Sequence, residues 1–203
     1  MTKLRLGVLC SGRGSNFQSI LDAIAAGDLP AEVAIMIADK PGIAAIDRAE
    51  KSGVKTVTLP VKDYARREDF ERAAVAELKS AKVDLVVLAG FMRLLTPYFV
   101  GEYAGRIMNI HPALLPAFPG AHAHQNVLAY GVKVSGCTVH FVDEGTDSGP
   151  IILQAAVPVL EDDTEETLAA RVLEQEHIIY PKAIRLFAEG KLKIDGRRVL
   201  IAR

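Results

Sequence analysis

The chain is poor in cysteine, carries almost no net charge and contains no long uninterrupted hydrophobic run. Its two cysteines, Cys10 and Cys137, lie in apolar strand-like segments and give no disulfide framework. A formal charge of −1 provides no field for holding nucleic acid or a membrane surface. The longest uncharged apolar run, between Asp84 and Arg93, is too short to span a bilayer. Any phosphate that the chain binds therefore needs a local site.

The N-terminal segment also lacks the features of a secretory signal. Lys3 and Arg5 interrupt its apolar residues, and no cleavage-site pattern follows. With so few cysteines, this favours a protein of the reducing cytoplasm. Of the 203 residues, 50% are hydrophobic and 24% charged, so the chain suits one globular domain or two small ones.

What the chain does contain is an alternation of strand and helix patterns. Apolar runs typical of strands occupy 3–10, 31–39, 55–60 and 83–90, and helical spacing occupies 17–27, 42–53 and 64–81. Near-continuous apolar strands separated by helices predict an open, twisted, mostly parallel sheet with helices on both faces.

The second half is less regular. It predicts strands at 106–111, 133–143 and 149–159, helices at 124–131 and 164–190, and a terminal hairpin at 191–202. The antiparallel strands therefore fall in the C-terminal part. No repeat, low-complexity tract or linker interrupts the chain, which indicates one α/β domain.

The segment SGRGSN, residues 11–16, joins the first expected strand to the first expected helix. An open parallel sheet binds phosphate at this place. Gly12 and Gly14 permit a sharp turn, Ser15 and Asn16 add polar donors, and the helix N-terminus attracts an anion. A plain glycine-rich turn is the alternative.

Two sharper phosphate motifs fail in this segment. The triphosphate loop requires Gly-Lys-Ser/Thr, which does not follow. A dinucleotide fingerprint would use Gly12, Gly14 and Asp39, but Phe17 stands where a third small residue is needed. A monophosphate fits better than a pyrophosphate.

Asn109 and His111 stand two apart at the end of the expected strand 106–111, immediately before a proline-rich exit. In an extended strand such residues project to the same side. The amide offers donors to a developing oxyanion, and the imidazole transfers protons near neutral pH. The alternative is a buried pair satisfied by neighbouring backbone.

The segment VDEGTDSGPI, residues 142–151, supplies Asp143, Glu144 and Asp147 after another expected strand. A carboxylate near His111 would favour its protonated form, a better acid for acyl transfer. The alternative for all three acids is a solvated turn, because Asp beside Gly is common in turns.

Other patterns carry less weight. His122 and His124 are spaced as two metal ligands, but no Cys or Glu cluster completes a zinc site, so we expect no metal. The segment TDSGP is typical of trypsin-like proteases, whose architecture this α/β pattern does not match.

Taken together, the motifs resemble those of phosphoribosylglycinamide formyltransferases, folate-dependent enzymes of purine biosynthesis. The resemblance is carried, in order, by SGRGSN, VVLAGFMRLL, NIHPALLPAFPG, GCTVHFVDEGTDSGPIILQ and EQEHIIYP, over nearly the whole chain. It implies a Rossmann-like formyltransferase fold in a single domain, 1–203. Residues 1–105 would form a phosphate-binding half, and residues 106–203 a catalytic and folate-binding half.

The resemblance also implies roles for individual residues. The catalytic set would be Asn109, His111 and Asp147. The ribonucleotide would be bound by Gly14, Ser15, Asn16 and Glu176, with Glu176 near the substrate amine. The folate site would be lined by Arg67, Met92, Arg93, Leu94, Leu95, Asn109, Val142, Asp143, Glu144 and Asp147. A cis peptide bond is implied at Leu115–Pro116.

Without the resemblance, local pattern gives different interpretations for some of these residues. The stretch FMRLL, residues 91–95, would be predicted as core apart from Arg93, a loop cation. Helical spacing would place Glu176 on an exposed face.

The implied co-substrate is 10-formyltetrahydrofolate, and the implied partners are small molecules, glycinamide ribonucleotide among them. No nucleic acid or membrane is expected, and the protein would be a cytoplasmic monomer or homodimer. Related alternatives are a methionyl-tRNA formyltransferase and a folate deformylase, which carry further domains. Unrelated ones are a nicotinamide-dependent oxidoreductase and a non-catalytic phosphosugar-binding module.

Overall fold

The structure is a computed structural model that describes residues 3–202, so Met1, Thr2 and Arg203 lie outside the described part. The chain divides into two compact units, Met1–Met108 and Asn109–Arg203. The division falls within strand β5 (Ile107–His111), close to the predicted boundary between the halves. The single-domain interpretation stays a prediction.

The first unit alternates strands and helices. In chain order these are β1 (Leu4–Cys10), α1 (Ser15–Ala25), β2 (Ala31–Ala38), α2 (Ala44–Lys51), β3 (Thr56–Thr58), η1 (Val61–Asp63), α3 (Arg67–Ser80), β4 (Leu85–Leu88) and α4 (Pro97–Glu102). The 3-10 helix η1 and the helix α4 were not predicted. Six residues are too few for α4 to display a helical period.

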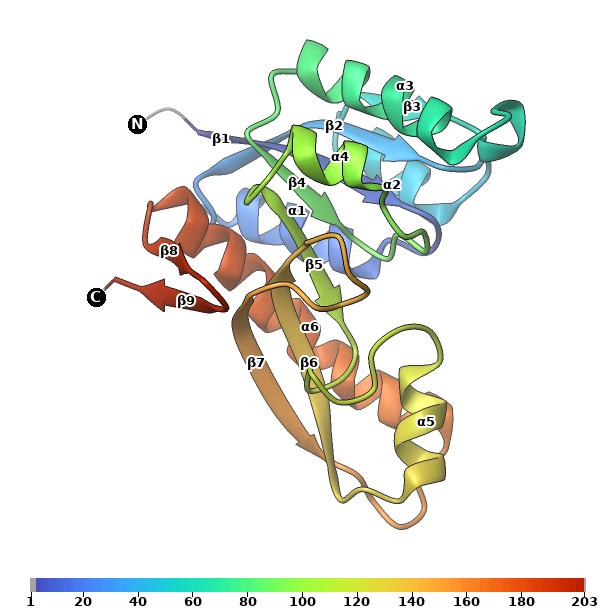
Figure 1. The fold of residues 1–203 in the computed structure, drawn as a ribbon, viewed down its shortest axis with the longest axis vertical. Coiled ribbons are helices and arrows are strands. Elements are labelled where there is room, and N and C mark those ends of the chain that lie inside the picture. The colour runs from blue at the N-terminus through green and yellow to red at the C-terminus, as the bar shows by residue number, and fades with distance from the viewer. Residues whose placement is uncertain (1–2, 203) are drawn as a thin grey trace. The chain divides into compact units, whose positions relative to one another are not determined.

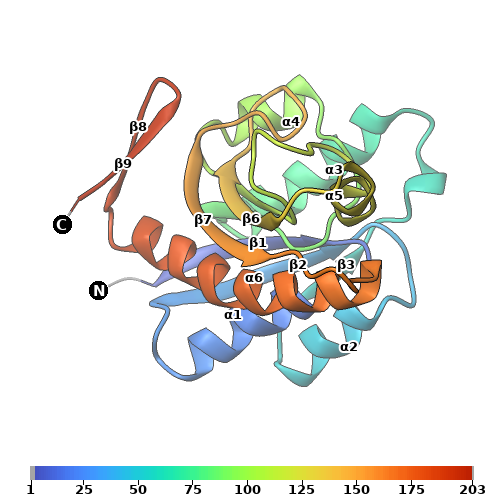
Figure 2. The same ribbon diagram turned by 90° about the horizontal axis from the view of Figure 1, so that it is seen from below.

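The strands of the first unit form a parallel sheet in the order β3-β2-β1-β4. Figure 2 shows α1 and α2 on one face of these strands and α3 and α4 on the other. Covered on both faces, the central strands bury nearly every side chain, with Leu6, Val8, Ile37 and Val87 all at 0% exposure. Double coverage explains why these strands are apolar without alternation.

The second unit holds β5, α5 (Ala123–Tyr130), β6 (Val134–Phe141), β7 (Ile151–Pro158), α6 (Glu165–Ala188), β8 (Leu192–Asp195) and β9 (Arg198–Ile201). Their order in the sheet is β5-β6-β7-β9-β8. The pairs β6–β7 and β8–β9 are antiparallel, and the second pair is the predicted hairpin. The helix α6 packs along β6 and β7 (Figure 1). The α/β fold class is thus confirmed, with antiparallel strands in the C-terminal part.

The start of α6 is closed by a reciprocal capping pair. The Thr164 hydroxyl accepts a hydrogen bond from the Thr167 N–H, 3.3 Å away, and the Thr167 hydroxyl accepts one from the Thr164 N–H, 3.0 Å away. This reciprocal pair satisfies two backbone donors that the first turn leaves without helical partners.

Buried polar side chains hold the segment that follows β5. The Thr138 hydroxyl, fully buried on β6, donates to the Ala113 carbonyl and accepts from the Leu115 N–H, at 2.7 and 3.1 Å. The Gln154 amide on β7 donates to the Leu115 carbonyl at 2.9 Å. The Leu115–Pro116 bond is cis, as predicted. The strand exit is thus fixed by its neighbours as well as by its own prolines.

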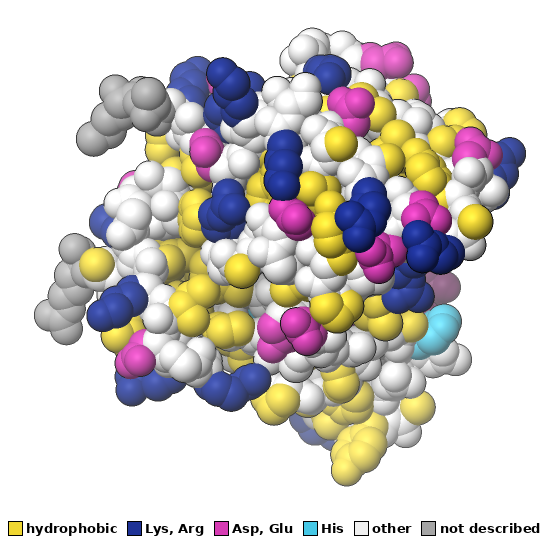
Figure 3. Space-filling model, turned by 45° about the horizontal axis from the view of Figure 1, so that its top comes forward, with side chains coloured by type: hydrophobic (Ala, Val, Ile, Leu, Met, Phe, Trp, Pro, Cys, Tyr) yellow, Lys and Arg dark blue, Asp and Glu magenta, His cyan; other side chains and the backbone are white. Residues whose placement is uncertain are grey.

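Basic and acidic side chains are interspersed on the face shown in Figure 3, in keeping with the near-zero formal charge. Within residues 3–202, no helix combines the length and apolar character needed to cross a membrane.

Candidate active site

An amide, an imidazole and a carboxylate lie together in the second unit. Asn109 and His111 are the third and last residues of β5, and Asp147 belongs to the loop after β6. Asp147 Oδ2 lies 3.3 Å from His111 Nδ1, and Asp147 Oδ1 lies 3.5 Å from Asn109 Nδ2. The side chains of His111 and Asp147 are 6% and 15% exposed, which shields their contact from bulk water.

The His111 ring is held at both nitrogens. Its Nε2 lies 2.8 Å from the Phe118 carbonyl oxygen, while Nδ1 faces the Asp147 carboxylate. Carbonyl and carboxylate oxygens only accept hydrogen bonds, so a ring that satisfies both contacts carries a proton on each nitrogen. The pocket around His111 therefore suits an imidazolium, which is a proton donor.

Asp147 is kept ionised by its surroundings. Burial acts to raise its pKa, but hydrogen bonding, chiefly from the Gly120 N–H, and the charge of His111 lower the pKa to about 2. The Gly120 N–H lies 2.8 Å from Oδ2, whereas His140 Nε2 is 3.6 Å from Oδ1, beyond hydrogen-bond distance. We therefore assign the principal hydrogen bond to Gly120. Asp147 is negative throughout the neutral range.

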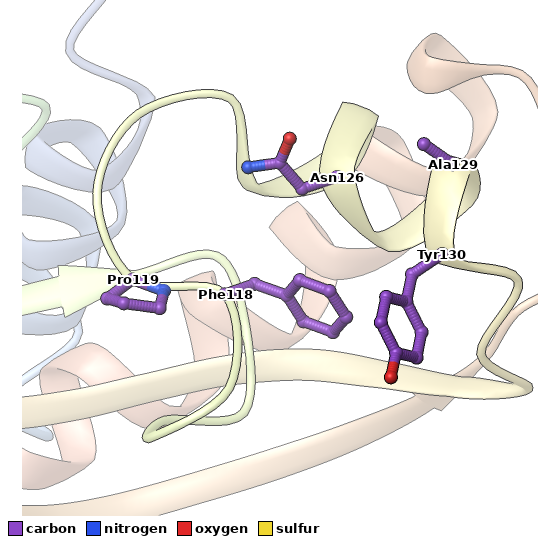
Figure 4. A pocket seen from close by; sticks show the side chains of 5 residues that line it. All are labelled: Phe118, Pro119, Asn126, Ala129 and Tyr130. Atoms are coloured by element: carbon purple, nitrogen blue, oxygen red, sulfur yellow. The ribbon is translucent and has the colours of Figure 1, made fainter.

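The segment Phe118–Gly120 contacts both His111 and Asp147 and is anchored from its other side. Phe118 has a positive φ of 53°, and its ring meets the Tyr130 ring edge to face at 5.9 Å. The two rings border a depression of about 520 Å³, which Figure 4 shows lined by Phe118, Pro119, Asn126, Ala129 and Tyr130. None of the predicted site residues lines this depression. The ring contact holds the backbone whose carbonyl faces His111.

The other acids of the loop after β6 differ from Asp147. Asp143 Oδ1 accepts from the Ser148 hydroxyl at 2.6 Å and from the Gly145 N–H at 3.1 Å, a turn-forming arrangement. Glu144 is exposed, and Val142 is half-buried. A folate contact by these residues stays a prediction.

The predicted phosphate loop lies between β1 and α1 in the first unit. Gly14 is the N-cap residue of α1, with a left-handed φ of 69°, and no described side chain caps the helix. Ser15 is half-buried, and Asn16 is 8% exposed. The backbone donors of the first turn are thus not occupied by a capping side chain, as an anion site at a helix N-terminus requires.

We expect Gly14→Ala to lower the free energy of unfolding by about 2 kcal/mol or more, because a left-handed backbone is strained for alanine. An added Cβ would also meet Ala45 Cβ at 2.8 Å. Gly12→Ala is the matched control, since its Cβ meets nothing within 4 Å, and should cost less than about 0.5 kcal/mol. Denaturant unfolding of both variants measures the difference, and equal losses would contradict the strain argument.

The stretch Met92–Leu95 lies outside the core. Of the residues 91–95 that local apolar pattern predicts as core, Phe91 is buried and Leu95 half-buried, but the prediction is wrong for Met92 and Leu94, which are 81% and 57% exposed. The physical reason is that the run continues past the end of β4 into a loop. Exposed apolar side chains of this kind are available to a ligand.

Arg93 is paired with Asp39, the acid that directly follows β2. The Arg93 Nε donates to Asp39 Oδ2 at 2.9 Å, and Asp39 is only 3% exposed. An acid as buried as Asp39 offers little access to a ribose hydroxyl, which weakens the nicotinamide alternative. Arg67, also predicted for the folate site, is exposed at the start of α3.

Glu176 is buried, at 7% exposure, although helical spacing alone predicts an exposed position. That local prediction was wrong, because α6 is covered on more than one side. Burial and then the charge of Glu176 raise the pKa of the Cys137 thiol on β6 to about 12. This places a carboxylate beside the apolar interior of the second unit, and Cys137 is an unreactive thiol.

His140 also belongs to the cluster, although no sequence motif singled it out. This residue of β6 is 2% exposed, and its Nε2 lies 3.3 Å from Asn109 Nδ2. The available signal was its place on an inward-facing position of a buried strand, next to the acidic loop.

His122 and His124 do not come together with other ligands. His122 is exposed, and His124 is half-buried. Among residues 3–202, no group of three or more His, Cys, Asp or Glu side chains is placed to hold a metal ion.

An α/β fold that places an imidazole and an amide beside a buried carboxylate, at the end of a strand, is suited to enzymes that act on a carbonyl group. Within that class, the chain belongs to the formyl transferase family, whose model matches residues 4–184. It is therefore a group-transfer enzyme with a Rossmann-like fold.

Individual relatives agree with this assignment. A phosphoribosylglycinamide formyltransferase of Escherichia coli is 43% identical, over 97% of this chain and 96% of that protein. A crystal structure of glycinamide ribonucleotide transformylase 1 from Symbiobacterium toebii has a TM-score of 0.98 and 51% identity, covering 100% of this chain and 95% of that one. A trifunctional purine biosynthetic protein of Drosophila melanogaster is 47% identical over 94% of this chain, which spans only 14% of that protein.

Proposed function

We propose that this chain transfers the formyl group of 10-formyltetrahydrofolate to the amine of glycinamide ribonucleotide, a step of purine biosynthesis. The observation that carries the proposal is the contact among Asn109, His111 and Asp147 within 3.5 Å at the end of β5. The similarity to phosphoribosylglycinamide formyltransferases over nearly their whole length supports the choice of substrates.

The chemistry needs no nucleophile from the protein. The substrate amine attacks the formyl carbon, a carbon–nitrogen bond forms, and the carbonyl oxygen becomes an oxyanion. Asn109 and the His111 imidazolium stabilise that oxyanion, and one such donor is worth about 3 kcal/mol. The bond from carbon to the folate nitrogen then breaks. His111 supplies the proton that this nitrogen takes up, and the attacking amine releases a proton to solvent.

Asp147 stabilises the charged imidazole until His111 gives up its proton, and again when solvent returns a proton to the ring, since its own carboxylate stays ionised. In the structure the second His111 donor faces the Phe118 carbonyl. We propose that this proton changes partner, from the Phe118 oxygen to the reacting oxygen, when the substrates bind.

Substrate binding is assigned on the family pattern together with the local geometry. The ribonucleotide phosphate would take the backbone and side-chain donors of Gly14, Ser15 and Asn16 at the start of α1. Glu176 would lie near the amine. The folate would contact Arg67, Met92, Arg93, Leu94, Leu95, Asn109, Val142, Asp143, Glu144 and Asp147. We further propose a cytoplasmic monomer or homodimer that acts on small molecules without a metal.

The test is an assay that follows folate absorbance with glycinamide ribonucleotide as the acceptor. We expect turnover that depends on both substrates and is absent when the ribonucleotide is omitted. Folate release without an acceptor would instead indicate a deformylase, and turnover only with methionyl-tRNA would indicate a tRNA formyltransferase. Binding of the ribonucleotide without turnover would favour a phosphosugar-binding module.

A further inference from the structure

His140 is buried beside the catalytic cluster and contacts two of its members, yet it has no part in the proposed chemistry. It is 2% exposed on β6. Its Nδ1 lies 2.9 Å from the Phe141 carbonyl oxygen, its Nε2 lies 3.3 Å from Asn109 Nδ2, and Nε2 lies 3.6 Å from Asp147 Oδ1.

The Phe141 carbonyl determines which nitrogen of His140 bears the proton. A carbonyl oxygen only accepts, so Nδ1 must donate to it. In the neutral ring Nε2 is then a lone-pair acceptor, because the hydrogen bond at one ring nitrogen sets the state of the other. The partner of Nε2 must therefore be a donor, and the Asn109 amide N–H at 3.3 Å is one.

This contact in turn determines how the Asn109 amide is oriented. With Nδ2 toward His140, one N–H donates to the ring, and the second lies on the side of Asp147, whose Oδ1 is 3.5 Å away. If the amide were reversed, its oxygen would face both the Nε2 lone pair and an ionised carboxylate, and both contacts would be repulsive. The loosely held second N–H lies on the same side as His111.

We infer that His140 is a positioning residue for formyl transfer, which holds the Asn109 amide with an N–H, not its oxygen, directed toward the reacting carbonyl. The inference rests on the proposed function for its chemistry and on the three distances above for its geometry. A donor replaced by an oxygen at that point would repel the developing oxyanion, so the orientation decides whether Asn109 assists or opposes the reaction.

Two substitutions separate the two hydrogen bonds of His140. Glutamine places an amide oxygen near the position of Nε2 and can still accept from Asn109. Asparagine reaches only as far as Nδ1, so it can donate to the Phe141 carbonyl but offers Asn109 nothing. We expect His140→Asn to lower kcat about 10- to 100-fold with the KM of each substrate changed less than about twofold. His140→Gln should retain kcat within about fivefold of the wild type.

A double-mutant cycle tests the route through Asn109. In an Asn109→Ala background, adding His140→Asn should lower kcat no further, since the group that His140 orients is gone. Three results would each overturn the inference. The first is a wild-type kcat in His140→Asn, and the second is an equal loss of kcat in the Gln and Asn variants. The third is that His140→Asn lowers kcat by the same factor in the Asn109→Ala background as in the wild type. Thermal unfolding of every variant shows whether it is folded. If a variant is not folded, the ¹⁵N spectrum of the wild-type His140 ring tests the inference in place of the cycle.

The tautomer provides a readout that does not depend on activity. The ¹⁵N spectrum of the His140 ring in the wild-type protein at neutral pH should show a protonated Nδ1 and an unprotonated Nε2. A proton on Nε2 would overturn the inference even if the enzyme is active. Absence of formyl transfer in a wild-type protein with the expected tautomer would instead refute the proposed function and leave the geometry intact.

Discussion

Replacing His111 by alanine will lower kcat for formyl transfer by about three orders of magnitude. The substitution removes a charged donor from the oxyanion and the proton source for the departing nitrogen, and either effect alone is worth about 10²- to 10³-fold. The ring is held between Asp147 Oδ2 at 3.3 Å and the Phe118 carbonyl at 2.8 Å, so no neighbouring side chain takes its place. Steady-state kinetics with both substrates measure the loss.

The control for this variant is His122→Asn, which changes an exposed histidine at the start of α5. Asparagine tolerates the left-handed backbone that His122 adopts, with φ of 63°, and we expect near-normal turnover. His111→Ala should keep its thermal unfolding close to that of the wild type, because the Gly120 N–H still binds Asp147. A His111→Ala enzyme within tenfold of wild-type kcat would remove His111 from the mechanism.

Asp147→Asn should lower kcat about 10²- to 10³-fold, although the asparagine side chain has nearly the same shape as aspartate. The neutral amide no longer stabilises an imidazolium 3.3 Å away, and it no longer opposes reversal of the Asn109 amide. Glu161→Gln is the matched charge control, since this exposed acid forms a surface ion pair with Lys133. Full activity in Asp147→Asn would contradict the assigned role.

The same variant makes a prediction about acid stability. The pKa of Asp147 falls from an ordinary value of 3.8 to about 2 in the folded protein. An acid whose pKa is lower in the folded than in the unfolded state stabilises the fold at any pH above its unfolded pKa. That stabilisation disappears as the pH falls through the pKa of the folded state. The advantage in Tm of the wild type over Asp147→Asn, taken at pH 5, should therefore narrow below about pH 4. A Tm difference that widens below pH 4 would contradict the assignment of an ionised Asp147 carboxylate.

Most of the secondary structure was predictable because its signals are local. Near-continuous apolar runs marked β1, β2 and β4, and helical spacing marked α1, α3 and α6. The wrong predictions also come from the local nature of these signals. α4 is too short to show a period, and the apolar run of β4 continues past the strand into exposed Met92 and Leu94. Glu176 is buried because of what covers α6, which helical spacing does not encode.

For the candidate site, too, local sequence signals predicted some features and missed others. From sequence alone, Asn109 and His111 had to share one side of a strand, since side chains two apart in a strand point the same way. Which of the three acids in the later loop meets His111 was open from the residues themselves, and only the resemblance selected Asp147. His140 had only a local signal, its place on a buried strand beside the acidic loop, which does not reveal that its partner Asn109 is 31 positions away.

The amino-acid sequence by itself determined the α/β alternation, the polar pair that ends β5 and the proline-rich exit that follows it, since each depends on neighbours a few residues apart. Tertiary structure decided that Asp147 rather than Asp143 reaches the imidazole, that the Phe118 carbonyl occupies its other nitrogen, and that His140 orients the amide. The first of those contacts joins residues 36 positions apart, Asp147 and His111. These contacts exist only because the packing of β5 against β6, and of the exit segment on both, brings their side chains within hydrogen-bond distance.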